Sequence, residues 1–255
     1  MKKAIIFGWT GTVIDFGSRA PVLALAQTLA EHDIDASESD ICAPMGLAMW
    51  DHVAEVLHLP SINTAWVDQR GRAPSAEDVE AVYQSLLPKL EDAIADHSTL
   101  VPGARETLSG LRARGYKIGA TTAYPRSIIE PTLPSIGAQG FSLDTMICSD
   151  DLAEARPGPL VIYQCLVDMA VYPTSSVIKV ASSVPGIAEG IAAGCMTIGV
   201  ALSGHYAGQT PEDIREMDDS QIASLRERAV RELMAAGAHH VIDTVADLPD
   251  LLERL

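Results

Sequence analysis

Short apolar strands alternate with helices throughout the second half of the chain, and this alternation constrains the fold more than any other feature. Strands are expected at Tyr116–Thr121, Thr145–Cys148, Val177–Val180, Met196–Val200 and His240–Ile242. Helices are expected between or after them, at Ala104–Arg114, Ser127–Ile136, Leu160–Met169, Ile187–Ala193 and Ile222–Ala236. Right-handed crossovers join such strands into a parallel sheet. The sequence therefore predicts an α/β fold with a Rossmann-like, doubly wound parallel sheet.

One further strand is expected at the start of the chain, followed by a long helical stretch. The apolar run Ala4–Phe7 is a buried strand that ends in the glycine-rich turn Gly8–Gly11. Residues 16–98 show helical spacing interrupted by prolines, and nothing in them is typical of a strand. We therefore predict an α/β core at 1–15 and 99–255, and an all-α cap domain inserted at 16–98.

Charge and hydropathy exclude several classes of protein. The net charge is −16, from 34 acidic and 18 basic residues, and such a surface repels nucleic acid and anionic lipid. No apolar run reaches the roughly 20 residues of a membrane span, and the apolar start is too short for a signal peptide. We expect a cytoplasmic protein. Its 4 cysteines include no CxxC pair, which predicts reduced thiols and no zinc site.

In open α/β sheets, ligands bind beyond the carboxyl ends of the strands. The residues that follow the predicted strands are therefore the ones in which a functional site is expected. Four such segments contain glycine, hydroxyl or charged side chains: Gly8–Thr12, Thr121–Tyr124, Asp150–Arg156 and Ala181–Gly186.

These strand ends resemble the motifs of the haloacid dehalogenase superfamily and, within it, of the phosphonoacetaldehyde hydrolase family. The matching segments, in chain order, are Ile6–Asp15, Pro44–Leu47, Asp51–Val53, Thr121–Tyr124, Ser149–Asp151, Arg156-Pro157, Ile178–Val180 and Glu189-Gly190. The resemblance extends over nearly the whole chain. It implies a haloacid dehalogenase fold with a C1-type helical cap.

The resemblance also implies catalytic groups that this chain lacks at the matching positions. The family attacks phosphorus with an aspartate where this chain has Gly8, and forms a Schiff base with a lysine where it has Met49. The family holds Mg²⁺ with carboxylates where this chain has Ser182 and Gly186. We therefore predict a divergent protein that cannot carry out the phosphonoacetaldehyde hydrolase reaction and uses no metal or other cofactor.

The side of the site that would bind an oxyanion is better retained. The resemblance implies this role for Thr12, Thr122, Tyr124, Arg156 and Lys179. Hydroxyl groups donate hydrogen bonds to such an anion, and a guanidinium can bind two of its oxygens at once.

Two residues at family-like positions are candidate catalytic bases, His52 and Asp15. Each candidate also has a structural alternative. His52 could be a core histidine, and Asp15 or Thr122 could only cap the following helix. Arg156 could form an ion pair, and Lys179 could lie on the surface.

Three functions remain open at this point. The first is a metal-independent enzyme, or subunit of one, that binds a sulfate- or phosphate-type group and promotes its elimination or intramolecular displacement. The second is an inactive pseudoenzyme subunit that stabilises a related active partner, and the third is a small-anion sensor. The expected partners are a small anionic substrate and a second subunit, identical or related, bound through the cap.

Overall fold

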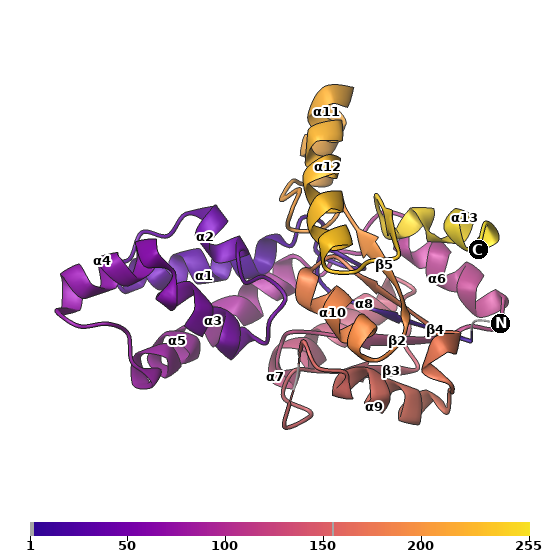
Figure 1. Cartoon of the computed structure of the whole chain (residues 1–255), viewed down its shortest axis with the longest axis horizontal. Coiled ribbons are helices and arrows are strands. Elements are labelled where there is room, and N and C mark those ends of the chain that lie inside the picture. The colour runs from indigo at the N-terminus through magenta and orange to yellow at the C-terminus, as the bar shows by residue number, and fades with distance from the viewer. Residues whose placement is uncertain (1–2, 155) are drawn as a thin grey trace.

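The computed structural model describes residues 3–154 and 156–255, and within them six strands form one parallel sheet (Figure 1). Every pair of neighbouring strands is parallel. In sheet order the strands are β3 (Thr145–Ile147), β2 (Lys117–Thr121), β1 (Ala4–Phe7), β4 (Val177–Ala181), β5 (Met196–Val200) and β6 (His240–Ile242). The predicted doubly wound α/β fold is confirmed.

Helices cover both faces of this sheet, and the side chains of β1 show why. Ile5 and Phe7 belong to the apolar cluster on one face, whereas Ala4 and Ile6 belong to the cluster on the other. Strands buried on both sides are continuous apolar runs, as the sequence of β1 is. The helices of the core are α6 (Ala104–Ala113), α7 (Arg126–Ile129), α8 (Leu133–Ala138), α9 (Leu160–Met169), α10 (Val184–Ala192), α11 (Pro211–Glu216), α12 (Asp219–Ala235) and α13 (Leu248–Glu253), of which α11 buries no residue and projects away from the sheet (Figure 1).

One predicted helix, Ser127–Ile136, is divided in the structure. A 3-10 turn at Glu130–Thr132 separates α7 from α8. Pro131 and Pro134 lie at and just after this turn. Because proline has no backbone N–H to donate, a regular α-helix cannot continue through this segment.

Five helices lie between β1 and α6 and form a unit to one side of the sheet (Figure 1). We call α1–α5 the five-helix unit. Leu25 and Leu29 of α1 share an apolar core with Leu86 and Leu90 of α5. The unit consists of α1 (Arg19–Glu31), α2 (Glu38–Cys42), α3 (Met49–His58), α4 (Pro60–Arg70) and α5 (Ala76–Asp96). The domain boundaries at 15–16 and 98–99 stay a prediction.

The two chain segments that join the five-helix unit to the core are hydrogen-bonded to each other. The backbone N–H of Asp15 donates to the carbonyl of Thr99 (3.2 Å), and that of Val101 donates to the carbonyl of Val13 (2.9 Å). The Asp15 carboxylate then accepts from the N–H of Arg19 (2.9 Å) at the start of α1. This pairing fixes the direction in which the helical unit leaves the sheet.

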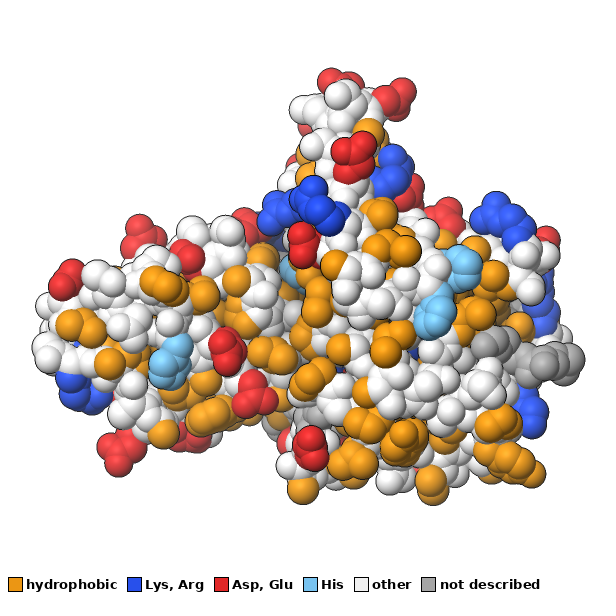
Figure 2. Space-filling view, viewed as in Figure 1, with side chains coloured by type: hydrophobic (Ala, Val, Ile, Leu, Met, Phe, Trp, Pro, Cys, Tyr) orange, Lys and Arg blue, Asp and Glu red, His pale blue; other side chains and the backbone are white. Residues whose placement is uncertain are grey.

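The surface carries one row of exposed apolar side chains on the core. Leu160, Tyr163 and Val167 lie on the outer side of α9, and Tyr172 follows it. Figure 2 shows apolar side chains gathered along this edge, where α9 lies in Figure 1. Within the two ranges described above, no helix is both long enough and apolar enough to span a membrane.

Candidate functional site

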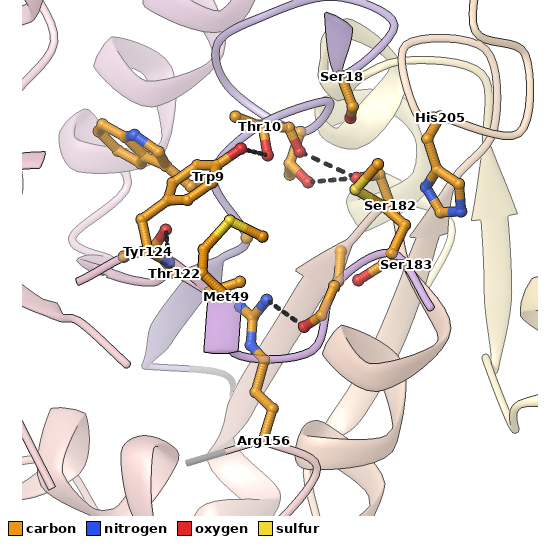
Figure 3. Close-up of a pocket in the computed structure, with 16 residues that line it drawn as sticks. Trp9, Thr10, Ser18, Met49, Thr122, Tyr124, Arg156, Ser182, Ser183 and His205 are labelled. Carbon is orange, nitrogen blue, oxygen red and sulfur yellow. Dashed lines mark hydrogen bonds between the residues drawn. The ribbon is translucent and has the colours of Figure 1, made fainter. Parts of the chain in front are cut away.

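A narrow cavity with about 30 Å³ of free space lies where β1, β2 and β4 end, against the five-helix unit (Figure 3). The sheet order places β1 between β2 and β4, so this is the point at which the order of strands reverses and where such folds bind ligands. The lining residues are Gly8, Trp9, Thr10, Thr12, Ser18, Met45, Gly46, Met49, Thr122, Ala123, Tyr124, Arg156, Ala181, Ser182, Ser183 and His205.

The residues predicted from the sequence divide into two groups. Those that line the cavity are Gly8, Thr12, Met49, Thr122, Tyr124, Arg156 and Ser182. Those that lie outside its lining are Asp15, His52, Lys179 and Gly186. The strand-end rule therefore brings together most of the predicted oxyanion-binding residues, but neither predicted base.

A chain of hydroxyl groups occupies the cavity where the resemblance implied carboxylates. Thr12 Oγ1 donates to Ser182 Oγ (3.2 Å), which donates to the carbonyl of Thr10 (3.1 Å). A Cβ added to Gly8 would lie 2.9 Å from Thr12 Oγ1, so the threonine hydroxyl fills the space that a side chain would need. The result is a neutral, hydrogen-bonding wall.

The other end of that wall depends on the first turn of α10. Ser183 caps this helix, because its Oγ accepts from the N–H of Gly186 (3.3 Å). A Cβ on Gly186 would lie 2.8 Å from the Cβ of Ala181, a distance that real Cβ atoms essentially never show. The glycine is therefore required for close packing between α10 and the end of β4.

Met49 brings the five-helix unit to the cavity. It is the first residue of α3, and its backbone N–H donates to the carbonyl of Ala123 (3.1 Å), just beyond β2. Its thioether lies among the lining residues in Figure 3. Met49, Met45 and Trp9 add apolar side chains to the lining of the cavity.

The predicted hydroxyl residues after β2 lie at the cavity. Thr122 Oγ1 accepts from the backbone N–H of Tyr124 (3.2 Å), and the Tyr124 hydroxyl donates to Thr10 Oγ1 (3.4 Å). Burial raises the pKa of Tyr124, with the carboxylate of Asp15 acting in the same direction. Tyr124 is therefore protonated at neutral pH and can donate a hydrogen bond.

Beneath the cavity lies a buried charge cluster made of Lys179, Glu189 and Arg156. Lys179 Nζ lies 2.7 Å from Glu189 Oε1 and donates to Thr121 Oγ1 (2.6 Å), and both side chains of this ion pair are fully buried. Burial opposes both charges. The pKa of Glu189 is nonetheless lowered by the neighbouring Arg156 and Lys179, whereas burial lowers the pKa of Lys179. The ammonium of Lys179 is thus held inside the core, away from the cavity.

Arg156 connects this cluster to the cavity. Its Nε lies 2.7 Å from Glu189 Oε2, and its Nη2 donates to the carbonyl and the Oγ1 of Thr121 (2.9 Å each). Its Nη1 points toward the carbonyl of Gly46 in the five-helix unit (3.4 Å). By formal charge the cluster holds two cations and one carboxylate, an excess of one positive charge, and the guanidinium of Arg156 lies at the cavity wall.

The two predicted bases have structural surroundings. The Asp15 carboxylate caps α1, and burial, the largest influence, raises its pKa to about 6. His52 is completely buried, and its Nε2 donates to the carbonyl of Ile41 (2.8 Å). Burial lowers the pKa of His52 to about 4, so its imidazole is neutral.

Sequence reasoning missed two residues of this site, His205 and Glu189. His205 follows β5 and lines the cavity, so the strand-end rule would have found it if it had been applied to that strand. Glu189 is the counter-ion of both buried cations. A carboxylate at a buried position of α10, near a lysine in a buried strand, was the available signal.

The chain resembles known proteins along most of its length. Residues 2–194 match the family model of haloacid dehalogenase-like hydrolases. A phosphonoacetaldehyde hydrolase from Paraburkholderia xenovorans is 40% identical, over 96% of this chain and 92% of the relative. One from Klebsiella pneumoniae is 38% identical, over 98% of this chain and 94% of the relative.

Solved structures are also similar to this chain along nearly its whole length. The crystal structure of a phosphonoacetaldehyde hydrolase-like protein from Oleispira antarctica superposes with a TM-score of 0.97 and 33% identity, over 99% of this chain and 92% of the other. A predicted phosphoglycolate phosphatase from Haemophilus somnus has a TM-score of 0.72 and 18% identity, over 98% of both chains. The second likeness shows the fold alone.

These similarities contradict the predicted loss of phosphonoacetaldehyde hydrolysis. Relatives that are 36–40% identical over nearly the whole chain carry the name of that activity. The three functions drawn from the replaced positions, namely an enzyme for other leaving groups, an inactive subunit and an anion sensor, are therefore wrong. The prediction rested on single positions such as Gly8 and Met49, whereas the similarity extends over nearly the whole chain.

The prediction that the chain uses no cofactor is also wrong, because the family resemblance implies Mg²⁺. In the described part of the chain, no three His, Cys, Asp or Glu side chains are grouped so that they could hold a metal. Protein-bound Mg²⁺ usually takes one or two carboxylates. The hydroxyl and carbonyl oxygens of the cavity do not fit that requirement.

Proposed function

Because the chain belongs to the haloacid dehalogenase-like hydrolase family, we propose that it hydrolyses the carbon–phosphorus bond of a small phosphonate. Phosphonoacetaldehyde, the compound in the name of its relatives, is the first substrate to test. The products of that hydrolysis are acetaldehyde and phosphate.

The excess positive charge of the buried cluster is the observation that carries this proposal. Arg156 and Lys179 share the single carboxylate of Glu189, and only Arg156 reaches the cavity. The described lining residues include no carboxylate. An anionic group in the cavity would therefore balance a charge that the protein leaves unbalanced, and a phosphonate supplies it.

The cavity offers different surfaces to the two ends of such a substrate. Hydroxyls of Thr12, Thr122 and Ser182 can donate hydrogen bonds to phosphonate oxygens, as the guanidinium of Arg156 can. Met49 and Trp9 would contact the carbon end and keep bulk water from it. Since Gly8 has no side chain, water is the attacking group in this scheme.

We infer that residues 16–98 act as a cap that admits the substrate. The carbonyl of Gly46 and the side chain of Met49 belong to this segment and meet the core at the cavity. About 30 Å³ of free space holds roughly two water molecules, so a phosphonate can enter only if the cap moves.

A dimer and a cytoplasmic location also remain proposals. Leu23, Trp50 and Val67 are large apolar side chains exposed on the five-helix unit, which supports a contact with a second subunit, identical or related, through this unit. Light scattering of the purified protein would give its mass in solution, and a monomer at all concentrations would contradict a homodimer.

The test of the activity is phosphate release from phosphonoacetaldehyde, measured with and without added Mg²⁺. We expect release by the wild type and a large loss in Arg156→Met, which keeps the side chain's length but not its charge. Arg105→Met is the matched control, because Arg105 is exposed and pairs only with the exposed Glu106 in the structure. A wild type that releases no phosphate under either condition would refute the proposal.

A further inference from the structure

His205 stands in the cavity without a hydrogen-bond partner for one ring nitrogen. Its side chain is almost wholly buried, at 7% exposure, and the structure assigns no partner in residues 3–154 and 156–255 to its Nδ1. Its ring packs against that of Tyr206, with centroids 4.0 Å apart and the two planes tilted by 39°. In Figure 3 it lies beside Ser182 and Ser183, across the cavity from Trp9.

His205 is also the one basic group of the described lining that can take up a proton. The other titratable lining residues are Arg156, which already carries its proton at any relevant pH, and Tyr124, whose buried phenol keeps its proton. Both of them donate hydrogen bonds. A reaction that releases a proton in this cavity therefore has a single neutral side-chain base available.

We propose that His205 is the proton acceptor of the cavity and removes a proton from the water that attacks the substrate. This proposal rests on the proposed hydrolysis of a phosphonate. The water oxygen forms the new bond to phosphorus as the carbon–phosphorus bond breaks. The electron pair of that bond leaves with the carbon, as the enolate of acetaldehyde. The imidazolium of His205 then returns the proton to this carbon, which yields acetaldehyde and phosphate and restores the neutral ring.

The surroundings of His205 make its basicity depend on a bound anion. Burial, the largest influence, lowers its pKa to about 3, and the neighbouring His52 and Arg228 act in the same direction. A phosphonate in the cavity would favour the imidazolium and raise that pKa. Because this coupling is reciprocal, the anion must also bind more tightly as the pH falls. The base is thus strengthened when the substrate is present.

Two variants test the role in turnover, His205→Gln and His205→Asn. A general base contributes about 100-fold to 10,000-fold, so we expect kcat to fall by at least about 100-fold with little change in KM. His58→Gln is the control, because His58 is exposed on α3 and its Nδ1 contacts only the carbonyl of Ala54. If the wild type turns over and both His205 variants retain full activity, the inference is overturned while the proposed function stands.

A second measurement does not depend on turnover or on a variant that folds. The imidazole signals of the wild type are titrated by NMR with and without phosphonoacetate, a stable phosphonate. We expect the pKa of His205 to rise on binding, whereas the ring signals of the exposed His58 should not respond to phosphonoacetate. If the wild type releases no phosphate, the proposed function fails, and this titration then decides only whether His205 takes up a proton beside a bound phosphonate. An unchanged His205 titration with bound phosphonoacetate overturns the inference.

Discussion

Glu189 balances two buried cations, and its replacement by glutamine gives a sharp test of that arrangement. Glu189→Gln keeps the shape of the side chain but leaves Lys179 and Arg156 facing each other without a counter-ion. Removal of one partner from a buried ion pair typically costs about 3–5 kcal/mol. At roughly 2–4 °C per kcal/mol for a chain of this size, the melting temperature should fall by about 6–20 °C.

Lys179→Met is the matched comparison within the same cluster. It leaves one cation and one carboxylate, and the bond between Arg156 Nε and Glu189 Oε2 (2.7 Å) is retained. Because the remaining charges are balanced, we expect a smaller loss in the free energy of unfolding than in Glu189→Gln. Urea denaturation of both variants and the wild type at one pH gives the three values directly.

The order of the two variants decides the question. If Glu189→Gln costs less than about 1 kcal/mol, as an exposed pair would, the cluster is not held by its charge balance. If Lys179→Met is the more destabilising of the two, packing of the lysine stem outweighs the electrostatic argument. The first result would also weaken the support for an anion-binding cavity, because the excess charge at Arg156 is deduced from the same cluster.

The remaining predictions concern stability. Gly186→Ala should lower the free energy of unfolding by about 1–3 kcal/mol, because the added Cβ overpacks against the end of β4. Gly110→Ala on α6, where a Cβ meets nothing within 4 Å, should raise it by about 0.5–1 kcal/mol, and thermal unfolding of the two variants compares them. Asp15 has φ 52°, a left-handed conformation that asparagine adopts more readily than alanine, and its carboxylate caps α1. Asp15→Ala should therefore lower the free energy of unfolding by at least about 1 kcal/mol more than Asp15→Asn, and equal melting temperatures of the two variants would contradict this. In the folded protein the pKa values of His52 and His205 lie below the usual 6.5, so in acid the unfolded state binds more protons than the folded state. The free energy of unfolding should therefore fall by about 2 kcal/mol for each of the two residues as the pH is lowered from 7 to 5. Asp15, whose pKa is raised to about 6, acts in the opposite direction and contributes about 1 kcal/mol over that pH range. Urea denaturation of the wild type and His205→Gln at pH 7 and pH 5 should show that the variant loses less free energy of unfolding in acid.

The strands could be located from sequence because they are buried on both faces. Continuous apolar runs such as Ala4–Phe7 admit few other interpretations, and the strand-end rule then pointed to Thr122 and Arg156 at the cavity. Lys179 shows the limit of that reasoning. A lysine inside a buried strand must have a counter-ion, but the counter-ion Glu189 comes from a helix whose approach is set by tertiary packing.

Local sequence also gave little information on the two predicted bases. Asp15 follows the first motif at a family-like position, yet its carboxylate is turned toward the backbone N–H groups that begin α1. His52 sits in a helix whose apolar face happens to include it, and it bonds a carbonyl of α2. Whether a polar side chain faces a cavity or a helix end depends on its orientation in the folded protein, which the spacing of residues along the sequence does not determine.

The narrowness of the cavity has a consequence for the time course of turnover. The cavity has about 30 Å³ of free space, so under the proposed cap motion Gly46 and Met49 would have to move away from the core before a substrate enters or a phosphate product leaves. The slowest event in such a cycle is often the opening that lets products leave. A mixing experiment would then show a rapid first turnover followed by a slower steady rate, and increased solvent viscosity would slow only the second phase.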